Sequence, residues 1–382
     1  MRIAVVIDAW YPVVGGSQTH VWELSFGLVN NCGYEVDIFT RALIDSNGTV
    51  CNQSEEYFNR RLRIIRVMPA AKLANIWGRI STIFTVAARA VAENRKKKYD
   101  LIHAHSILGG LSGKIVKIFI KRPLLFTVHG SPNLDRGKKN LEYYIEKFIL
   151  TGIRYNHVIS VGKKFGCYPN VNKEITNIPN GVSPEKFLTT NNPQNPNYFK
   201  ILFVGRLDWP KGLDYLIDAV KLLKDNHGSL INGSKVQIHL IGYGFHEQRY
   251  RAEVESFGLN ELIIFRGKIT EENLINEYQS SRLFILPSIC EGQPITLLEA
   301  MASRLPVLTT FSADNSDIID PATGWKVHSR DASALAETIL EILQTPSDQL
   351  KKMGEKGRRK IMADFRWDII IGRTIKIYNS LT

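Results

Sequence analysis

The sequence predicts an α/β protein made of two doubly wound parallel-sheet domains. Short apolar runs recur along the chain with helix-like or loop segments between them, which is the pattern of buried parallel strands joined by crossover connections. The pattern stops at a polar, proline-containing stretch, residues 189–198, and then restarts. A chain of 382 residues and 43.3 kDa is also too long for one ordinary core and suits two.

The apolar runs give the expected strands of each domain. In the first domain they are residues 3–7, 35–40, 101–103, 124–128 and 158–160. In the second they are residues 201–204, 236–241, 262–265, 283–286 and 306–309. Since ligands of open α/β sheets gather at the carboxyl ends of the strands, we expect the functional site in a cleft between the two domains.

Composition excludes several classes of protein. A hydrophobic content of 44% with 23% charged residues is ordinary for a soluble globular protein. No apolar stretch approaches the roughly 18 to 20 residues of a spanning helix, and the amino end runs directly into a strand pattern, so we expect a cytoplasmic protein without a cleaved signal. The four cysteines are scattered, which argues against a disulfide framework and a thiolate metal site.

The net positive charge comes entirely from the first half of the chain. Residues 1–180 carry 25 Lys and Arg against 13 Asp and Glu, whereas residues 181–382 carry 24 of each. A basic domain can meet nucleic acid, anionic lipid or a phosphorylated acceptor. Because no nucleic-acid-binding motif accompanies the charge, we expect no nucleic-acid partner.

Two acids eight residues apart mark the most informative segment, residues 291–302. Pro294 suits the first position of a helix, so Glu291 is expected in the preceding loop and Glu299 within the helix. The amides of about residues 293–296 then lack intrahelical acceptors and point, with the positive end of the helix dipole, toward a ligand such as a phosphate. Taken alone, the segment also fits a buried helix with two paired acids.

Two loops that follow first strands carry further candidates. Gly15 and Gly16 open a helix and allow close approach of a ligand, although a tight turn alone would also use them. Their spacing differs from a dinucleotide fingerprint, which disfavours an oxidoreductase. In the second domain Arg206 and Lys211 follow a strand and together could neutralise a diphosphate, while either alone fits a solvated surface charge.

Taken together, these motifs resemble retaining glycosyltransferases of family 4, which have the two-domain GT-B fold and use nucleotide diphosphate sugars. The resemblance covers nearly the whole chain. It rests on the following segments: Gly15-Gly16, residues 100–105, residues 127–130, residues 178–182, Gly205-Arg206-Leu207, Lys211-Gly212 and the Glu291/Glu299 pair.

The resemblance implies a role for each site residue of the second domain. Arg206 and Lys211 hold the donor diphosphate, Glu299 hydrogen-bonds the ribose hydroxyls, and Glu291 contacts hydroxyls of the donated sugar. The segment between the acids lines the sugar and phosphate with Gly292, Gln293, Pro294 and Ile295. Two cations and a helix amino end would stabilise the departing diphosphate more than the bound donor. The chain contains no Asp-x-Asp, which fits a reaction that needs no metal and no other cofactor.

The resemblance also implies roles for the first domain. His129 is similar to the histidine that touches the donor sugar, and Gly15-Gly16 to the loop that closes on the phosphates. Without that context, His129 fits equally a core histidine bonded to a backbone carbonyl. His105 fits an acceptor-side role or a purely structural one.

The expected domain limits follow from the same resemblance. The first domain comprises residues 1–185 and a last helix at about 366–382, which crosses back onto it with an apolar stripe, and the second comprises residues 186–365. The stripe consists of Trp367, Ile370, Ile371, Ile375 and Tyr378.

The sequence departs from the family pattern at several positions. Gln293 stands where an aromatic residue is usual, and Arg304 stands where glycine is common. Residues 312–315 replace a segment that often has two glycines, and Asp317 replaces a glutamate. The motifs do not choose the nucleotide, the sugar, the acceptor or the linkage. The donors of the family include UDP sugars and GDP-mannose.

The acceptor is expected to be a glycan or a lipid-linked molecule. Residues 73–98 predict an apolar-faced helix that ends in four basic residues, so the basic domain is a candidate for docking on an anionic membrane at the inner face. Most such helices simply pack on their own sheet. Two other classes remain open: a GT-B epimerase that acts on the nucleotide sugar itself, and a non-catalytic nucleotide-sugar-binding protein.

Overall fold

A computed structural model gives the arrangement of most of the chain. It describes the following residues: 1–10, 15–44, 50–51, 54–58, 60–71, 76–131, 133–134, 139–187, 198–311 and 318–382. Three segments named above lie outside these residues: positions 189–197 of the linker expected at 189–198, the start of the helix expected at 73, and positions 312–317. The chain forms two compact units, here called unit 1 and unit 2. Unit 1 comprises Met1–Asn180 and Trp367–Thr382, and unit 2 comprises Gly181–Arg366.

Unit 1 is built on one sheet, which has nine strands in the described part of the chain. The strands run in the order β4-β5-β2-β1-β6-β7-β8-β9, with β3 paired to β2. All neighbours from β5 to β9 are parallel, while β3 and β4 pair antiparallel. The bounds are β1 (Arg2–Ile7), β2 (Glu35–Ile44), β3 (Val50–Cys51), β4 (Glu55–Tyr57), β5 (Leu62–Ala71), β6 (Leu101–His105), β7 (Leu124–Val128), β8 (His157–Ser160) and β9 (Ile175–Asn177).

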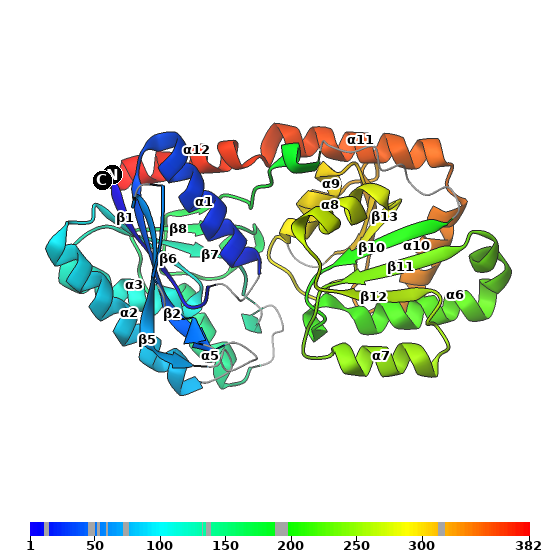
Figure 1. Ribbon diagram of the computed structural model, residues 1–382, viewed down its shortest axis with the longest axis horizontal. Coiled ribbons are helices and arrows are strands. Elements are labelled where there is room, and N and C mark those ends of the chain that lie inside the picture. The colour runs from blue at the N-terminus through cyan, green and yellow to red at the C-terminus, as the bar shows by residue number, and fades with distance from the viewer. Residues whose placement is uncertain are drawn as a thin grey trace. The chain divides into compact units, whose positions relative to one another are not determined.

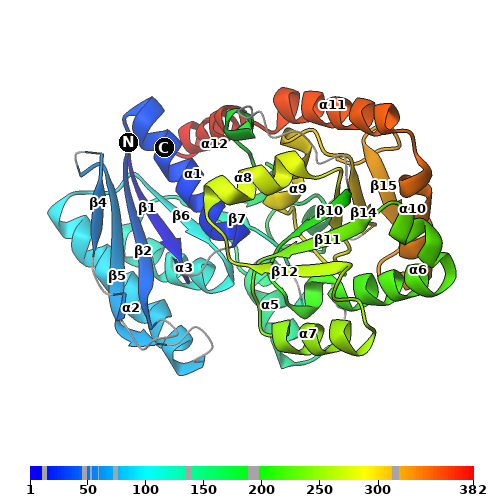
Figure 2. The same ribbon diagram turned by 45° about the vertical axis from the view of Figure 1, so that its right-hand side comes forward.

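Helices cover both faces of this sheet (Figures 1 and 2). On one face α1 lies beside α12, and their apolar residues share a core cluster with β1 and β2. On the other face α2 packs against α3 and against β5. The apolar stripe on the last helix therefore packs on unit 1. The helices are α1 (Gly16–Cys32), α2 (Ile76–Lys96), α3 (Ile107–Ile120), α5 (Leu141–Lys147) with a π-helical continuation (Phe148–Gly152), and α12 (Trp367–Leu381).

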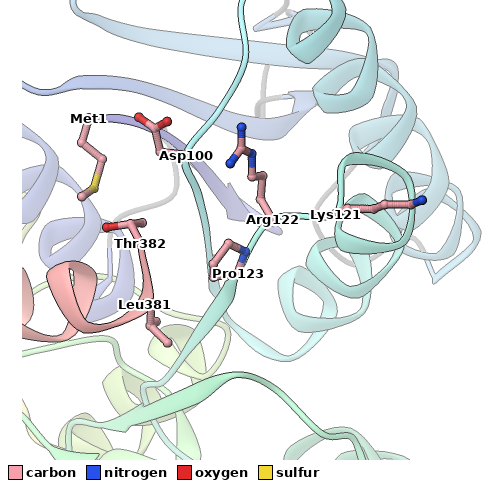
Figure 3. Close-up of a pocket in the computed structure, with 7 residues that line it drawn as sticks. All are labelled: Met1, Asp100, Lys121, Arg122, Pro123, Leu381 and Thr382. Atoms are coloured by element: carbon pink, nitrogen blue, oxygen red, sulfur yellow. The ribbon is translucent and has the colours of Figure 1, made fainter.

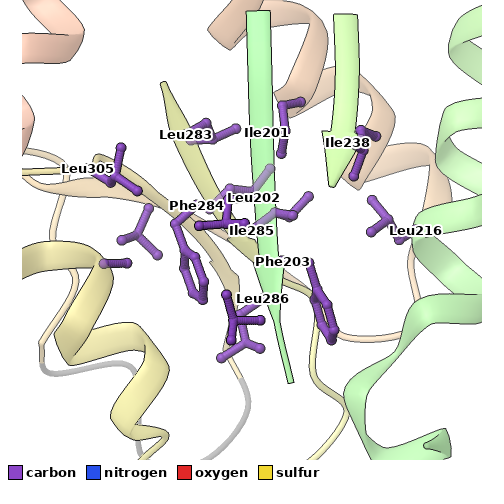
Figure 4. Packing of buried hydrophobic residues seen from close by; sticks show 14 of the residues in the cluster. Ile201, Leu202, Phe203, Leu216, Ile238, Leu283, Phe284, Ile285, Leu286 and Leu305 are labelled. Atoms are coloured by element: carbon purple, nitrogen blue, oxygen red, sulfur yellow. The ribbon is translucent and has the colours of Figure 1, made fainter. Parts of the chain in front are cut away.

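Unit 2 is built on a parallel sheet with the order β12-β11-β10-β13-β14-β15 in the described residues. Its central strands are apolar on both faces, because helices cover both, and Figure 4 shows β10 and β13 side chains packed between them. The strands are β10 (Phe199–Val204), β11 (Val236–Ile241), β12 (Ile263–Gly267), β13 (Leu283–Leu286), β14 (Val307–Thr310) and β15 (Gly324–Val327). The helices are α6 (Leu213–Gly233), α7 (Glu247–Ser256), α8 (Glu271–Ser280), α9 (Ile295–Ala302), α10 (Ala332–Gln344) and α11 (Ser347–Asp364).

Strand order defines a switch point in each sheet. From β1 the chain first builds outward through β2 to β5 and then returns to place β6 on the other side of β1. Unit 2 repeats this: β11 and β12 lie on one side of β10, and β13 lies on the other. Ligands of doubly wound sheets bind where the order reverses, outside the carboxyl ends of these two central strands. Ligand-binding residues are therefore expected in the loops after β1 and β6 in unit 1 and after β10 and β13 in unit 2.

The chain passes from one unit to the other twice, and the two connecting segments are hydrogen-bonded to each other. Val182 and Arg366 form an isolated parallel bridge, and the Val182 N–H donates to the carbonyl of Phe365 at 2.8 Å. Among the described residues, no helix combines the length and apolar character needed to cross a membrane.

Candidate functional site

The loop after β10 is held close to the loop after β13. Gly212 has φ +69°, and a Cβ there would lie 2.0 Å from the carbonyl oxygen of Pro287, so no other residue fits without a backbone shift. The N–H of Ile289 donates to the carbonyl of Pro210 at 2.8 Å. These contacts fix Lys211, at the end of the first loop, against the second loop.

Lys211 and Glu291 form an ion pair across the switch point of unit 2. The Lys211 ammonium donates to Oε1 of Glu291, and the Ser288 hydroxyl donates to the same oxygen at 2.9 Å. The Lys211 and Glu291 side chains are only 16% and 15% exposed. A cation and an acid held in contact at this edge suit the junction between a phosphate and a polyol, where one group meets charge and the other meets hydroxyls.

Arg206 stands apart from this pair. Its guanidinium lies 3.1 Å from the Asp208 carboxylate, and its side chain is 62% exposed. Asp208 in turn accepts a hydrogen bond from the N–H of Phe245, in the loop after β11, at 2.8 Å. The structure therefore does not bring Arg206 into contact with Lys211, although both lie in the loop after β10.

Helix α9 begins one residue later than expected, because Pro294 is its N-cap and Ile295 its first residue. No side chain caps this end, which leaves the first amides for another acceptor. The Thr296 hydroxyl, in the first turn, is buried and has no hydrogen-bond partner among the described residues. Gly292 and Gln293 lie in the loop between Glu291 and the cap. As expected, Glu291 lies before the helix and Glu299 within it.

Glu299 is oriented by a residue that the sequence did not single out. The Tyr278 hydroxyl on α8 donates to Oε2 of Glu299 at 2.8 Å. Burial, followed by the charge of Glu299, raises the pKa of Tyr278 well above its usual value, so the phenol remains a donor. Ser288 was missed in the same way, since a single serine or tyrosine carries no sequence signal until the fold brings it to a carboxylate.

The switch point of unit 1 holds a different group of residues. His105 ends β6, and His129 follows β7. Nδ1 of His105 lies 3.0 Å from Nε2 of His129, so the two are hydrogen-bonded. Gly15 is the N-cap of α1 and Gly16 its first residue, and a Cβ at Gly16 would meet nothing within 4 Å.

Asp8, just after β1, is a further residue that the sequence did not flag. Burial raises the pKa of its carboxyl group, against the opposing charges of Arg41 and Arg79. Perturbed acids are common at functional sites, so Asp8 is a further candidate at the carboxyl ends of the strands of unit 1.

A pocket of about 310 Å³ in unit 1 lies at the opposite edge of the sheet (Figure 3). Asp100 and Pro123, which precede β6 and β7, line it together with Met1 and Leu381. It is therefore remote from the carboxyl ends where ligands of this fold bind. In the described residues no group of three or more His, Cys, Asp or Glu is arranged to hold a metal ion.

Both halves of the sequence match glycosyltransferase families. Residues 14–186 match the family described as Glycosyltransferase Family 4, and residues 185–360 match the family described as Glycosyl transferases group 1. The chain belongs to glycosyltransferase family 4. The resemblance drawn from its motifs is thus confirmed.

Relatives and solved structures agree with the family and the fold. This glycosyltransferase is 24% identical to an uncharacterized glycosyltransferase of Methanocaldococcus jannaschii, over 99% of its own length and 98% of the relative's. It is 26% identical to the UDP-Gal:alpha-D-GlcNAc-diphosphoundecaprenol alpha-1,3-galactosyltransferase of Escherichia coli, over 74% and 75% of the two chains. A sucrose-phosphate synthase of Thermosynechococcus elongatus shares its fold with a TM-score of 0.87, at 23% identity and 100% and 98% coverage.

A second solved structure is HepE of Anabaena, determined in complex with UDP and glucose. It superimposes with a TM-score of 0.76 at 16% identity, and the match covers 100% of both chains. The two parallel-sheet units of this glycosyltransferase are therefore those of the GT-B fold, as predicted.

Proposed function

We propose that this glycosyltransferase transfers a hexose from a nucleotide diphosphate sugar to a hydroxyl of a glycan or lipid-linked acceptor, with retention of the anomeric configuration. The observation that carries the proposal is the contact of Lys211 with Glu291 across the switch point of unit 2, beside the uncapped start of α9. Nucleotide sugars offer what these groups recognise: a diphosphate next to a polyol.

Each site residue has a role in the proposal. Lys211 and Arg206 neutralise the diphosphate, and the amides at the start of α9 assist them. Glu291 accepts hydrogen bonds from the sugar hydroxyls, and Glu299, held by Tyr278, accepts them from the ribose. Residues Gly292, Gln293, Pro294 and Ile295 border the same ligand.

Unit 1 contributes to the same reaction in this proposal. His129 donates a hydrogen bond to the donor sugar. Gly15 and Gly16 allow the backbone to approach the phosphates, which is consistent with the open space beside Gly16. The bond from the anomeric carbon to the leaving phosphate oxygen breaks, the bond to the acceptor oxygen forms on the same face, and the leaving oxygen takes the acceptor's proton. This step needs no metal and no other cofactor.

Removal of the Lys211 ammonium tests the proposal directly. Lys211→Ala is expected to lower kcat/KM, because the negative charge that develops on the diphosphate loses its cation. The loss should correspond to an increase of about 2 to 4 kcal/mol in the activation free energy. The control is Lys221→Ala, which removes an exposed ammonium paired with Asp225 on α6. Kinetics with a panel of UDP and GDP sugars measure both variants. A Lys211→Ala enzyme as active as the control would refute the role.

Experiments on the native protein identify the donor and distinguish transfer from the two alternatives, an epimerase and a non-catalytic nucleotide-sugar-binding protein. A thermal-shift panel of nucleotide diphosphates and their sugars reports binding, because a ligand of the folded state raises its apparent stability. Incubation of the stabilising donor alone detects an epimer, and incubation with an acceptor pool detects transfer. NMR of the product gives the anomeric configuration, and EDTA in the assay tests the independence from metal.

We also propose that unit 1 docks on an anionic membrane at the cytoplasmic face, where a lipid-linked acceptor would lie. The formal net charge of +12 lies within residues 1–180. Large apolar side chains there face solvent, among them Ile118 and Phe119 on α3, which are 64% and 67% exposed. Such groups insert among lipid headgroups while basic residues meet anionic lipid.

Liposome sedimentation tests the docking. Native protein should bind vesicles with anionic lipid and bind neutral vesicles less, and Phe119→Asp should weaken binding. Phe245→Asp is the matched control, since Phe245 is 91% exposed but belongs to unit 2. Equal binding to both kinds of vesicle contradicts the proposal.

A further inference from the structure

Helix α5 and its π-helical continuation turn an apolar face to solvent. Leu141, Tyr144, Ile145 and Phe148 are between 49% and 75% exposed. Steps of three and four residues place these side chains on one side of the helix. A surface helix of a globular protein normally directs such a face toward the core and its polar residues outward. The arrangement in α5 is the reverse.

A buried acid maintains this orientation. The Glu146 carboxylate accepts hydrogen bonds from the N–H of Asn133 at 3.1 Å, from the N–H of Leu134 at 3.3 Å and from Nδ2 of Asn133 at 2.7 Å. Ile149 and Leu150, about one turn later, are also buried. Rotation of the helix to bury its outward face would break the bonds of Glu146 and expose Ile149 and Leu150. The apolar face is therefore a fixed feature of the folded domain, and a gathered face of this kind marks an interaction surface.

A polar pocket lies beside this helix, at strands β8 and β9. Its volume is about 380 Å³, and the residues that line it include Lys163, Lys173, Asn170 and Asn172. The segment that forms most of the lining, residues 162–173, carries three lysines and neither Asp nor Glu. Lys163 and Lys173 are both exposed. Such a pocket offers cations and polar side chains to an anion such as a phosphate.

Hydrogen bonds join the pocket segment to the end of the helix. The N–H of Val171 donates to the carbonyl of Thr151 at 2.9 Å, and Nδ2 of Asn172 donates to the carbonyl of Ile153 at 2.8 Å. Oδ1 of Asn172 accepts in turn from the N–H of Tyr155 at 2.7 Å. Val171 is itself exposed, so an apolar side chain stands beside the pocket as well. The apolar face and the pocket are thus parts of one connected region of unit 1.

Charge indicates the class of partner that this region fits. Arg136, Lys138 and Lys139 directly precede α5 in the sequence, and the pocket segment adds three lysines without an acid. Apolar side chains beside clustered basic residues are typical of surfaces that bind anionic lipid, where the apolar groups enter the acyl region and the cations meet phosphates. A protein partner would need an apolar and an acidic surface side by side, whereas a phospholipid supplies both groups in one molecule.

We propose that α5 and the pocket bind a phosphate-bearing lipid at a membrane surface. The outward face of α5 enters the apolar layer, and the lipid phosphate lies between Lys163 and Lys173. The assignment rests on the proposed docking of unit 1, and it names the helix and the lipid group that carry that docking. In the sheet, β6 and β7 lie between β8 and the switch point at β1, so this lipid is a docking ligand rather than the acceptor.

Two double variants separate the apolar from the charged contribution in liposome sedimentation. Leu141→Gln/Phe148→Gln should bind vesicles of neutral and of anionic phospholipid at least about 10-fold more weakly, because both kinds have an apolar interior. Lys163→Gln/Lys173→Gln should weaken binding to anionic vesicles alone, by roughly 25-fold, since each lysine near such a surface contributes about a factor of five.

The matched controls for these variants lie on α11 of unit 2. Met362→Gln removes an exposed apolar side chain, and Lys352→Gln removes an exposed ammonium. Both should bind vesicles like the native protein. Native-like binding by Leu141→Gln/Phe148→Gln would overturn the assignment of α5, and native-like binding by Lys163→Gln/Lys173→Gln would overturn that of the pocket.

Hydrogen exchange maps the same surface on the native protein. In the presence of anionic vesicles, exchange should slow in peptides that cover residues 141–152 and 163–173. It should remain unchanged in α12, which lies on the other face of the sheet. Protection confined to α3 would overturn the assignment to α5 and the pocket while leaving the docking of unit 1 intact.

Three further outcomes separate this assignment from its rivals and from the proposed function. Equal sedimentation of native protein with both kinds of vesicle contradicts the docking itself. A thermal shift by inorganic phosphate that Lys163→Gln/Lys173→Gln abolishes, without any change in vesicle binding, shows a site for a free anion and overturns the lipid assignment. A native dimer that Leu141→Gln/Phe148→Gln converts to a monomer shows a protein interface and overturns it too. Sugar transfer is assayed separately, so its absence refutes the proposed reaction without bearing on lipid binding.

Discussion

Arg304 shows how a single backbone angle explains a departure from the family pattern. The sequence places arginine where glycine is common, and the structure gives this residue φ +62°, in the left-handed region. A side chain there costs roughly 1 to 2 kcal/mol. The guanidinium lies 2.7 Å from the Glu355 carboxylate, but both side chains are about half exposed, so the pair contributes little.

Arg304→Gly is therefore expected to stabilise the protein by about 1 kcal/mol. Lys351→Gly on the exposed face of α11 is the control, and it should destabilise by about the same amount because its backbone is helical. Urea unfolding at pH 7 measures both. A lower midpoint for Arg304→Gly would show that the ion pair outweighs the strain.

Candidate site residues could be proposed from the sequence, but most of the side chains that contact them could not. The types and spacing of Lys211, Glu291 and Glu299 were enough to nominate them from the sequence. Their partners were not, because Ser288 and Tyr278 have no distinctive neighbours in sequence and meet the acids only through tertiary packing.

At the scale of elements, α8 supports α9 through one phenol. Tyr278 is completely buried, and its hydroxyl joins α8 to the Glu299 carboxylate. The carboxylate is thus held in one orientation before a ligand arrives, which reduces the ordering needed on binding.

Tyr278→Phe should raise KM for the donor several-fold and lower stability by about 1 kcal/mol, since the half-buried Glu299 carboxylate loses a donor. The matched control is Tyr250→Phe, because Tyr250 is also buried and its hydroxyl donates to Asp214 at 3.0 Å. Stability should fall in both variants, and donor KM only in the first. An equal rise in KM in both would refute the link to Glu299.

Most strands with an apolar run were predicted, but the ten-residue β5 and several short strands were missed. The predicted strands of both units exist, although those expected at 262–265 and 306–309 are shifted by one or two residues. The antiparallel strands β3 and β4 are two and three residues long and carry no apolar run, so only the neighbouring strand reveals them. β15 was missed for a similar reason, since it is four residues long and begins with glycine.

At the scale of the whole molecule, the two units contain buried ionisable groups of opposite kinds. Burial lowers the pKa of His20 to about 4, despite the hydrogen bond with Asn180. In unit 2 burial acts to raise the pKa of Glu277, but hydrogen bonds from His239 and Lys200 outweigh it and lower the pKa to about 2.

Unit 1 should therefore lose stability before unit 2 as the pH falls. The unfolded chain takes up protons at histidines below about pH 6.5, whereas folded His20 does so only near pH 4, so stabilisation is lost between these values, by about 3 kcal/mol for His20 alone. Glu277 keeps its contribution until the pH falls below about 4.5. Segment-resolved hydrogen exchange at pH 7 and pH 5 measures this. Earlier opening of β10 and α8 than of β6 and α1 at pH 5 would contradict it.

The bridge between Val182 and Arg366 limits how the halves of the enzyme can move. A single connecting segment would leave both lobes free to swivel by rotation about its bonds. Here two connecting segments are held together by a backbone hydrogen bond. Such a pair resists rotation about the bonds of either segment, while it still permits bending. Any opening and closing that accompanies turnover should then occur mainly about one axis.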